Sequence, residues 1–182
     1  MDNLKYQQNL ITAMKVLGEE SNVLFLGQTV IDGGSPMFNS LKEVSNNKKI
    51  EMPVIEDTQM GLSIGLALEG FIPISIFPRI DFLICATNEL VNHLDKIEKM
   101  SKGEFTPGVI IRTQIGNTKP LYPGIQHCGD YTIGLKHMLK NILVIRIKKE
   151  NDILPSYTLA LERAKNGKST LLIEDASGLW KA

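Results

Sequence analysis

The sequence predicts an α/β fold, a doubly wound and mainly parallel sheet with helices on both faces. Short apolar runs alternate with segments of helical periodicity from one end of the chain to the other. Turn-forming residues bound most of the apolar runs, which is typical of buried strands. Strands that are separated by helices pair in parallel, because each helix returns the chain to the edge where the previous strand began.

The first part of the chain is expected to hold three of the strands. Residues 3–20 place Leu4, Leu10, Met14 and Leu17 at helical spacing. The elements expected after this helix are a strand at 23–26, a loop at 28–40, a strand at 53–55, a helix at 58–69 and a strand at 72–77. The loop is assigned because it is rich in Gly, Asp, Ser and Pro.

The rest of the chain continues the alternation after one long helix. The expected elements are a helix at 80–101, a strand at 109–113, a helix at 131–139, a strand at 142–147, a helix at 153–165 and a strand at 170–174. Asn166-Gly167 supplies a left-handed stop for the last helix. The irregular segment 114–130 is the longest, and loops of this length in compact domains are usually functional or disordered.

Composition excludes several classes of function. A chain of 182 residues is expected to form one domain, 1–182, and its 20 basic and 20 acidic residues cancel. No basic field is therefore available for nucleic acid or an anionic membrane. We expect neither a membrane span nor a secretory leader. Cys85 and Cys128 lack metal-ligand spacing, which favours reduced thiols and a cytoplasmic location.

The segment 52-MPVIEDTQMGLSIGLALEGFIPI-74 contains the first candidate site. Glu56 follows the expected strand 53–55 and precedes a helix whose face carries Gly61, Gly65 and Ala67. Such a face allows close approach by another subunit or by a flat ligand, and α/β proteins hold ligands at the carboxyl ends of strands. The alternative is an acid that merely favours the start of the helix through its dipole.

The remaining motifs are weak, apart from one histidine. His127 lies in the long loop and is a plausible proton carrier at neutral pH, whereas His93 and His137 lie on expected helices and favour structural roles. Gly61-x-x-x-Gly65 and Gly167-Lys168-Ser169 do not complete a dinucleotide fingerprint or a phosphate loop. Neither a serine nucleophile elbow nor a set of metal ligands is recognised.

Taken together, these residues resemble the pyrimidine-binding domain of thiamine-diphosphate enzymes, in the transketolase and 2-oxoacid dehydrogenase branch. The chain is most similar to the amino-terminal half of the dehydrogenases' beta subunit. The resemblance covers nearly the whole chain and is carried by 10-LITAMKVLGEESNVLFLGQTV-30, 53-PVIEDTQMGLSIGLALEGFIPI-74, 81-DFLICATNELVNHLDKIEKMSKGEF-105, 109-VIIRTQIG-116, 126-QH-127 and 170-TLLIED-175.

The resemblance implies roles for three residues. Glu56 matches the acid that hydrogen-bonds the aminopyrimidine ring nitrogen, which lets the cofactor remove its own thiazolium proton. Phe82 matches the aromatic residue that stacks on the pyrimidine. His127 matches a loop histidine that moves protons at the substrate, although its neighbour is Cys128 where the family commonly has Ser.

Departures from the family imply a partner. The family holds Mg²⁺ and the diphosphate through a Gly-Asp-Gly sequence, but here Gly129-Asp130 continues as Tyr131. The resemblance therefore implies half of an active site, with Mg²⁺ on a second subunit and thiamine diphosphate shared between the two. A heterotetramer is expected, with homodimerisation through the glycine-faced helix at 58–69. The segment 28–50 is shorter than in the family, which is expected to reshape the substrate entrance.

The reaction and two rival functions stay open at this point. The small-molecule substrate is a 2-oxoacid or a ketose, and neither donor nor acceptor follows from the sequence. One rival is a non-catalytic interaction subunit that keeps the fold. The other is a flavodoxin-like α/β module that binds a small anion on its own.

Overall fold

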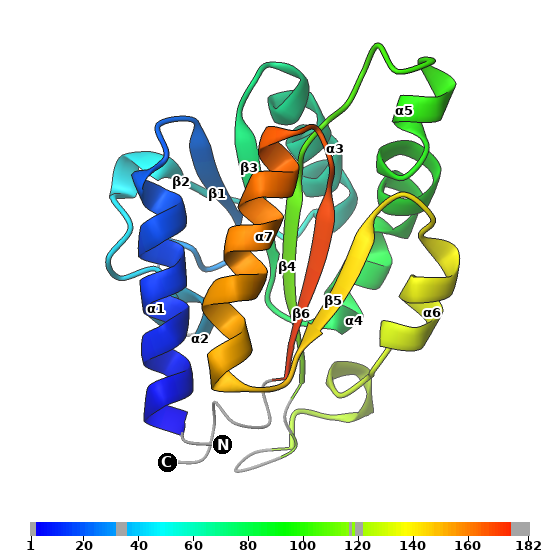
Figure 1. Ribbon diagram of the computed structural model, residues 1–182. Helices are drawn as coiled ribbons and strands as arrows, with labels where there is room; N and C mark the ends of the chain where they lie inside the picture. Colours follow the sequence, from blue (N-terminus) through cyan, green and yellow to red (C-terminus); the bar gives the residue numbers. More distant parts are fainter. Residues whose placement is uncertain (1–2, 32–35, 117, 119–121, 176–182) are drawn as a thin grey trace.

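The computed structural model describes residues 3–31, 36–116, 118 and 122–175 (Figure 1). Helices cover both faces of a central sheet. One face carries α1 (Asn3–Glu19), α2 (Pro36–Ser40) and α7 (Ile153–Lys165). The other face carries α3 (Glu56–Leu68), α4 (Ile80–Leu83), α5 (Ile97–Met100) and α6 (Thr132–Met138).

The sheet confirms the predicted fold class. Its six strands pair in parallel in the order β2-β1-β3-β4-β6-β5. They are β1 (Val23–Gly27), β2 (Lys49–Glu51), β3 (Ile72–Phe77), β4 (Ile110–Ile115), β5 (Leu143–Ile147) and β6 (Thr170–Asp175). The connection that leaves β1 goes to β2 on one side, and the connection that leaves β3 goes to β4 on the other. The switch point of this order therefore lies between β1 and β3.

Most elements lie within two or three residues of their predicted bounds, and β3 and α7 coincide with them. The strand predicted at 53–55 is wrong. Val54 is 74% exposed there, and Ile55 is the N-cap of α3. The strand that pairs beside β1 is instead Lys49–Glu51, with Leu26 opposite Ile50. Because this edge strand is short and polar, it lacks the apolar run by which the others are recognised.

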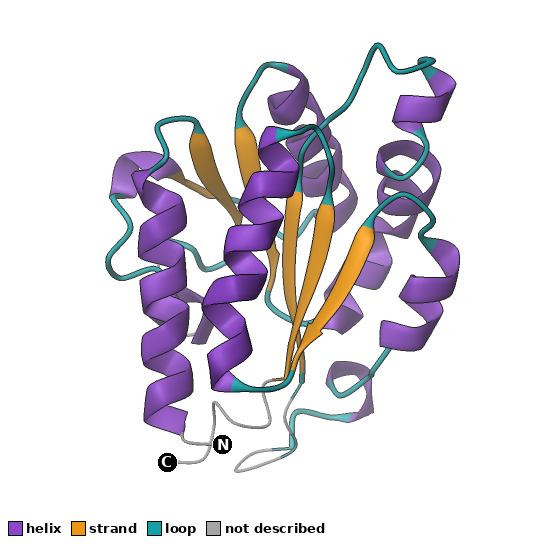
Figure 2. Cartoon of the chain, in the orientation of Figure 1, coloured by secondary structure: helices purple, strands orange, loops and turns teal. Residues whose placement is uncertain are grey.

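The continuous helix predicted at 80–101 is also wrong. The segment breaks into α4, a 3₁₀ turn η2 (Ile84–Ala86), a π-helical turn η3 (Glu89–Leu94) and α5. Figure 2 shows the helical parts of this segment on the same side of the sheet as α6. Directly after the π turn, the buried carboxylate of Asp95 accepts hydrogen bonds from the backbone N–H groups of Lys140, Asn141 and Ile142. An apolar pattern at helical spacing does not reveal such a contact, because its partners lie more than forty positions away.

Short elements that the sequence did not predict fill the loops. They are α2, η1 (Asn46–Lys48), η4 (Ile125–His127) and η5 (Glu150–Asp152). Parts of the loops expected at 28–40 and 114–130 lie outside the described residues.

Two apolar clusters fill the space between the sheet and its helices. The cluster beneath α1 and α7 includes Met14, Phe25 and Leu172, and the cluster beneath α3 and α4 includes Met60, Phe77 and Leu171. Neighbouring residues Leu171 and Leu172 point to opposite clusters, as the pleat of a strand requires. A sheet that is buried on both faces explains why its strands are apolar throughout.

An ion pair lies inside the first cluster. Arg112 on β4 and Glu174 on β6 are fully buried, and the Arg112 Nε donates to Glu174 at 2.7 Å. Arg112 also donates to the Ser40 hydroxyl at 2.7 Å, and the Tyr157 hydroxyl donates to Glu174. Burial raises the pKa of Tyr157 well above its ordinary value, so the hydroxyl keeps the proton that it donates. The network joins α2, α7 and two strands.

Removing one member of this buried pair is expected to destabilise the chain. Arg112→Met should lower the free energy of unfolding in urea by about 3–5 kcal/mol, because it leaves the Glu174 carboxylate buried without a cation. Arg112→Met with Glu174→Leu should recover much of the loss. Lys15→Gln, at an exposed ion pair with Glu43, should change the free energy of unfolding by less than about 1 kcal/mol. Equal losses for Arg112→Met and Lys15→Gln would contradict this reading.

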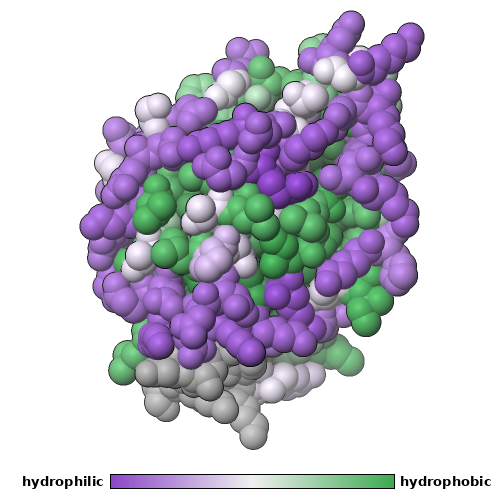
Figure 3. Space-filling model, in the orientation of Figure 1, coloured by the Kyte–Doolittle hydropathy of each residue, from purple (hydrophilic) through white to green (hydrophobic). Residues whose placement is uncertain are grey.

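The surface adds one feature. Hydrophobic side chains are exposed beside α7 and β5 in the view of Figure 3, and Leu143, Leu154 and Leu159 belong to these elements. Among the described helices, none combines the length and the apolar character that a membrane crossing requires.

Candidate functional site

Glu56 lies at the carboxyl edge of the sheet, beside the switch point. It opens α3, and its side chain is buried, with only 8% of the residue exposed. Gln28, which follows the last residue of β1, donates from Nε2 to Glu56 Oε1 at 3.0 Å. No described residue donates to the other oxygen, Oε2. The carboxylate is therefore held on one side and open to a ligand on the other.

A second carboxylate holds the segment that carries Gln28. Glu51, the last residue of β2, accepts hydrogen bonds from three successive backbone N–H groups, those of Thr29, Val30 and Ile31, at 2.5–2.8 Å. Thr29 adopts a left-handed backbone with φ of 55°, which is strained for a β-branched residue. Because the Glu51 carboxylate accepts from all three of these N–H groups, it stabilises this conformation and fixes the position of Gln28.

The glycine face of α3 is open. A Cβ atom placed on Gly61 or Gly65 would meet nothing within 4 Å, and Leu62 and Leu68 on the same helix are 39% and 43% exposed. The two glycines therefore allow no close packing that is seen within the described part of the chain. The expectation that a neighbouring molecule contacts this helix stays a prediction.

Phe82 and His127 come together although 45 positions separate them. Phe82 lies on α4, and His127 ends the short turn η4. Their ring centroids are 5.5 Å apart and their planes meet at 79°, an edge-to-face contact. Both side chains are half-buried. Among the described residues, Glu56 hydrogen-bonds to Gln28 and not to the His127 imidazole, so the candidate site consists of two separate groups at one edge of the sheet.

Polar groups around the two rings hold the loop that carries His127. Arg79 donates from Nη1 to the His127 carbonyl at 2.9 Å, and the Asp81 carboxylate accepts from the Gly129 N–H at 3.1 Å. Sequence reasoning missed these two residues, as it missed Gln28 and Glu51. All four act on a backbone group or on an oxygen that is distant in the sequence, so no local pattern reveals them.

Several buried polar atoms in this region have no partner in the described part of the chain. They are Gln59 Oε1, Asp81 Oδ2, Gln114 Oε1 and His127 Nδ1. Unsatisfied buried polar atoms are uncommon in folded proteins and are typical of places that bind water or a ligand. Gln114 lies on β4, His127 lies in the loop that follows β4, and Asp81 lies on α4, four residues after β3. These positions point to the carboxyl edge as the candidate binding region.

The other titratable candidates do not join the site. On the π-helical turn, His93 Nε2 lies 3.4 Å from Glu89 Oε2. His137 is exposed on α6. Cys128 is half-buried next to His127. No group of three or more potential metal ligands occurs among the described residues.

Comparison with curated proteins finds relatives of one kind. The pyruvate dehydrogenase E1 component subunit beta of Cyanidium caldarium is 31% identical over 108 residues, which are 58% of this chain and 33% of that protein. The 2-oxoisovalerate dehydrogenase subunit beta of Bacillus subtilis is 25% identical over 121 residues, 64% of this chain and 37% of that protein. The chain thus spans about a third of the length of these relatives. No family model matches it.

Solved structures agree on the fold. "Split gene transketolase, inactive beta4 tetramer" has a TM-score of 0.71 and 16% identity, over 93% of this chain and 51% of the other. Transketolase from Campylobacter jejuni has a TM-score of 0.67 and 13% identity, over 92% of this chain and 25% of the other. The predicted resemblance to dehydrogenase beta subunits and to the transketolase fold is confirmed.

Loss of the Glu51 carboxylate is expected to release the turn beside Glu56. Glu51→Ala should lower the free energy of unfolding by about 1.5–3 kcal/mol, the range for hydrogen bonds to a charged group. The measurement is urea denaturation of the chain. Glu69→Ala, at an exposed acid after α3, should stay within about 0.5 kcal/mol of wild type. If the turn is stable without the Glu51 carboxylate, the two variants should have similar free energies of unfolding, which would contradict this prediction.

Proposed function

We propose that this chain, a relative of the beta subunits of 2-oxoacid dehydrogenases with the fold of transketolase, is the pyrimidine-binding subunit of a split thiamine-diphosphate enzyme. Glu56 is the activating acid, Phe82 holds the aminopyrimidine and His127 moves protons at the substrate. A second polypeptide supplies the diphosphate site and its Mg²⁺. The proposal depends on one observation above all, the buried Glu56 carboxylate with one oxygen bound and the other open.

The residues at this edge fit the pyrimidine half of the cofactor. A ring nitrogen needs a hydrogen-bond partner that is shielded from water, and Glu56 is buried with an Oε2 that accepts from no donor among the described residues. An aromatic heterocycle needs a flat apolar neighbour, and Phe82 offers a half-buried ring. The unpartnered Gln59 Oε1, one turn along α3 from Glu56, adds an acceptor that suits an exocyclic amine.

The chemistry of the chain's own residues follows from their surroundings. Thiamine diphosphate, when bound, supplies a carbon nucleophile for the carbonyl of a 2-oxoacid or a ketose. Gln28 donates to Glu56 Oε1 and so orients the carboxylate, which leaves Oε2 to hold or accept the proton of a ring nitrogen. His127 has an unpartnered Nδ1 and can exchange a proton with a substrate oxygen there.

The curated relatives and the neighbours in structure support the proposal of a partner subunit. The match covers about a third of each dehydrogenase relative, and the matched split-gene transketolase is described as inactive in its beta4 form. We therefore propose a heterotetramer in which two copies of this chain meet at the centre through α3. The apolar side chains exposed on α7 and β5 provide a further surface for the second subunit.

We propose the substrate class from the names of the relatives. Both families of relatives named as dehydrogenases act on 2-oxoacids by their printed names, so a 2-oxoacid donor is favoured over a ketose. The identity of the acceptor substrate depends on the second subunit.

Replacing Glu56 tests the assignment in the reconstituted pair of subunits. Glu56→Gln should lower kcat by about 10²–10⁴-fold, because it keeps the shape of the side chain and removes the proton acceptor. The matched control is Asp57→Asn, the next and exposed acid of the same helical turn, which should keep activity within a few-fold. Full activity in Glu56→Gln would defeat the assignment.

Calorimetry separates this proposal from a non-catalytic subunit and from an anion-binding module. Thiamine diphosphate with Mg²⁺ should bind to the pair and not measurably to either subunit alone. Binding of an anion to this chain by itself would favour the module, and a pair that binds no cofactor would favour the non-catalytic subunit.

The open glycine face gives a test of self-association. Gly61→Ala should stabilise the isolated chain by about 0.5–1 kcal/mol, since alanine costs less than glycine inside a helix and a Cβ there meets no atom. The same change should weaken dimerisation at least about tenfold in sedimentation experiments, because it pushes the two helices apart.

Gly134→Ala is the matched control for that experiment. Gly134 lies on α6 with equally open space around it, so the substitution should stabilise the chain and leave association unchanged. Unchanged association in both variants would exclude α3 from the dimer contact.

A further inference from the structure

Two charged side chains of one short segment hold the backbone on both sides of Cys128. The segment is residues 78–82, which follow β3 and include the first three residues of α4, and it is called here the β3–α4 corner. Arg79 donates to the carbonyl of His127, and Asp81 accepts from the N–H of Gly129. In the described part of the chain neither side chain forms an ion pair. Their charges therefore strengthen hydrogen bonds to the loop.

Residues at the end of β4 and directly after it also hold the β3–α4 corner and the loop. A Cβ atom on Gly116 would lie 1.9 Å from the His127 carbonyl oxygen, so the strand's exit and the loop are in backbone contact. Gln114 donates from Nε2 to the Pro78 carbonyl at 2.9 Å, which anchors the start of the corner. The His127 carbonyl is thus held between Arg79 and Gly116.

Phe82 belongs to the same corner. The residues that place the His127 backbone therefore also place the aromatic ring that contacts the imidazole, with 5.5 Å between the ring centroids. Because the two rings contact edge to face, a small shift of the loop would separate them. The remaining polar atoms, Asp81 Oδ2 and His127 Nδ1, stay buried and unpartnered in this arrangement.

We propose that Arg79 and Asp81 are positioning residues that fix the His127 imidazole relative to Phe82. The proposal deepens the proposed function, in which His127 carries protons and Phe82 holds the pyrimidine. Arg79 and Asp81 act through the backbone of the loop and do not touch the substrate. One rigid corner then sets both the stacking residue and the proton carrier.

Nuclear magnetic resonance of the full chain tests the proposal without cofactor or partner. The imidazole C–H protons of His127, assigned with His127→Gln, are displaced by the ring current of Phe82, and Phe82→Leu gives the value without it. Arg79→Gln and Asp81→Ala should move these resonances at least half of the way to the Phe82→Leu value. Asp81→Ala should also speed exchange of the Gly129 amide about tenfold or more.

Conservative variants distinguish positioning from general damage. Asp81→Asn keeps an oxygen that accepts from the Gly129 N–H, so its His127 resonances should stay close to wild type. Arg79→Lys keeps the positive charge but lacks the planar guanidinium. It should therefore move the His127 resonances less far from their wild-type positions than Arg79→Gln does. The resonances of His93 and His137 report that the fold is intact in each variant.

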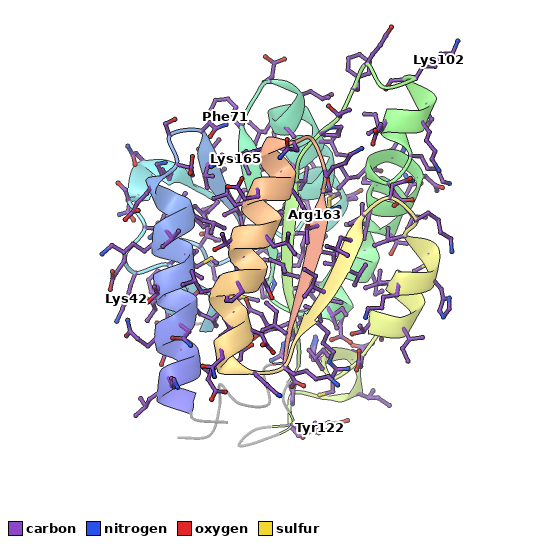
Figure 4. The ribbon with its side chains drawn as sticks, viewed as in Figure 1. Lys42, Phe71, Lys102, Tyr122, Arg163 and Lys165 are labelled. Carbon is purple, nitrogen blue, oxygen red and sulfur yellow. The ribbon has the colours of Figure 1, made fainter. Side chains whose placement is uncertain are left out.

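Arg163→Gln is the matched control. Arg163 likewise donates to a backbone carbonyl, that of Ser169, but it lies at the opposite end of the sheet from Tyr122, which precedes His127 in the loop (Figure 4). Its removal should leave the His127 resonances unchanged. The proposal would be overturned if the His127 resonances were unchanged in folded Arg79→Gln. It would also be overturned if they were unchanged in both single variants Arg79→Lys and Asp81→Ala.

Activity of the reconstituted pair gives the second readout. Arg79→Gln should lower kcat about tenfold or more and leave thiamine diphosphate affinity within a few-fold, since the pyrimidine contacts are kept. Loss of cofactor affinity equal to the loss in kcat would contradict a positioning role. The resonance experiment holds even if Glu56→Gln stays active, so failure of the proposed function and failure of this inference give different results.

Discussion

Parallel pairing of all six strands determines where this chain can hold a ligand. Every strand ends at the same edge, so each connection that follows a strand starts there. Gln28 follows β1, Arg79 follows β3, and the loop with His127 follows β4. Groups that lie far apart in the sequence thus collect at one edge, where the strand order reverses between β1 and β3.

The sequence predicted those parts of the fold that apolar side chains determine. β3 and α7 coincide with their predicted bounds, because a run buried on both faces and an amphipathic helix carry clear patterns. The strand at β2 was missed, since Lys49 and Glu51 at the sheet edge meet water. Glu56 was assigned to the correct edge although the element before it was wrong, because the start of α3 was recognised independently.

The candidate site divides in the same way. Glu56, Phe82 and His127 were predicted as site residues from a resemblance in which these residue types occur in the same order. Their supports were not found, because Glu51, Arg79 and Asp81 bind backbone groups and any segment has those. The contact between Phe82 and His127 follows from the supports, so the sequence predicted the two members and not the geometry that joins them.

The backbone contact between Gly116 and His127 has a consequence for how this fold can diversify. Because the strand's exit and the histidine touch, the stretch of chain between them starts and ends at nearly the same point. The entropy of closing such an excursion grows only slowly with its length. Insertions or deletions there could change the length of this stretch while the imidazole keeps its place, so under the proposed function substrate preference could change without disturbing the proposed proton carrier.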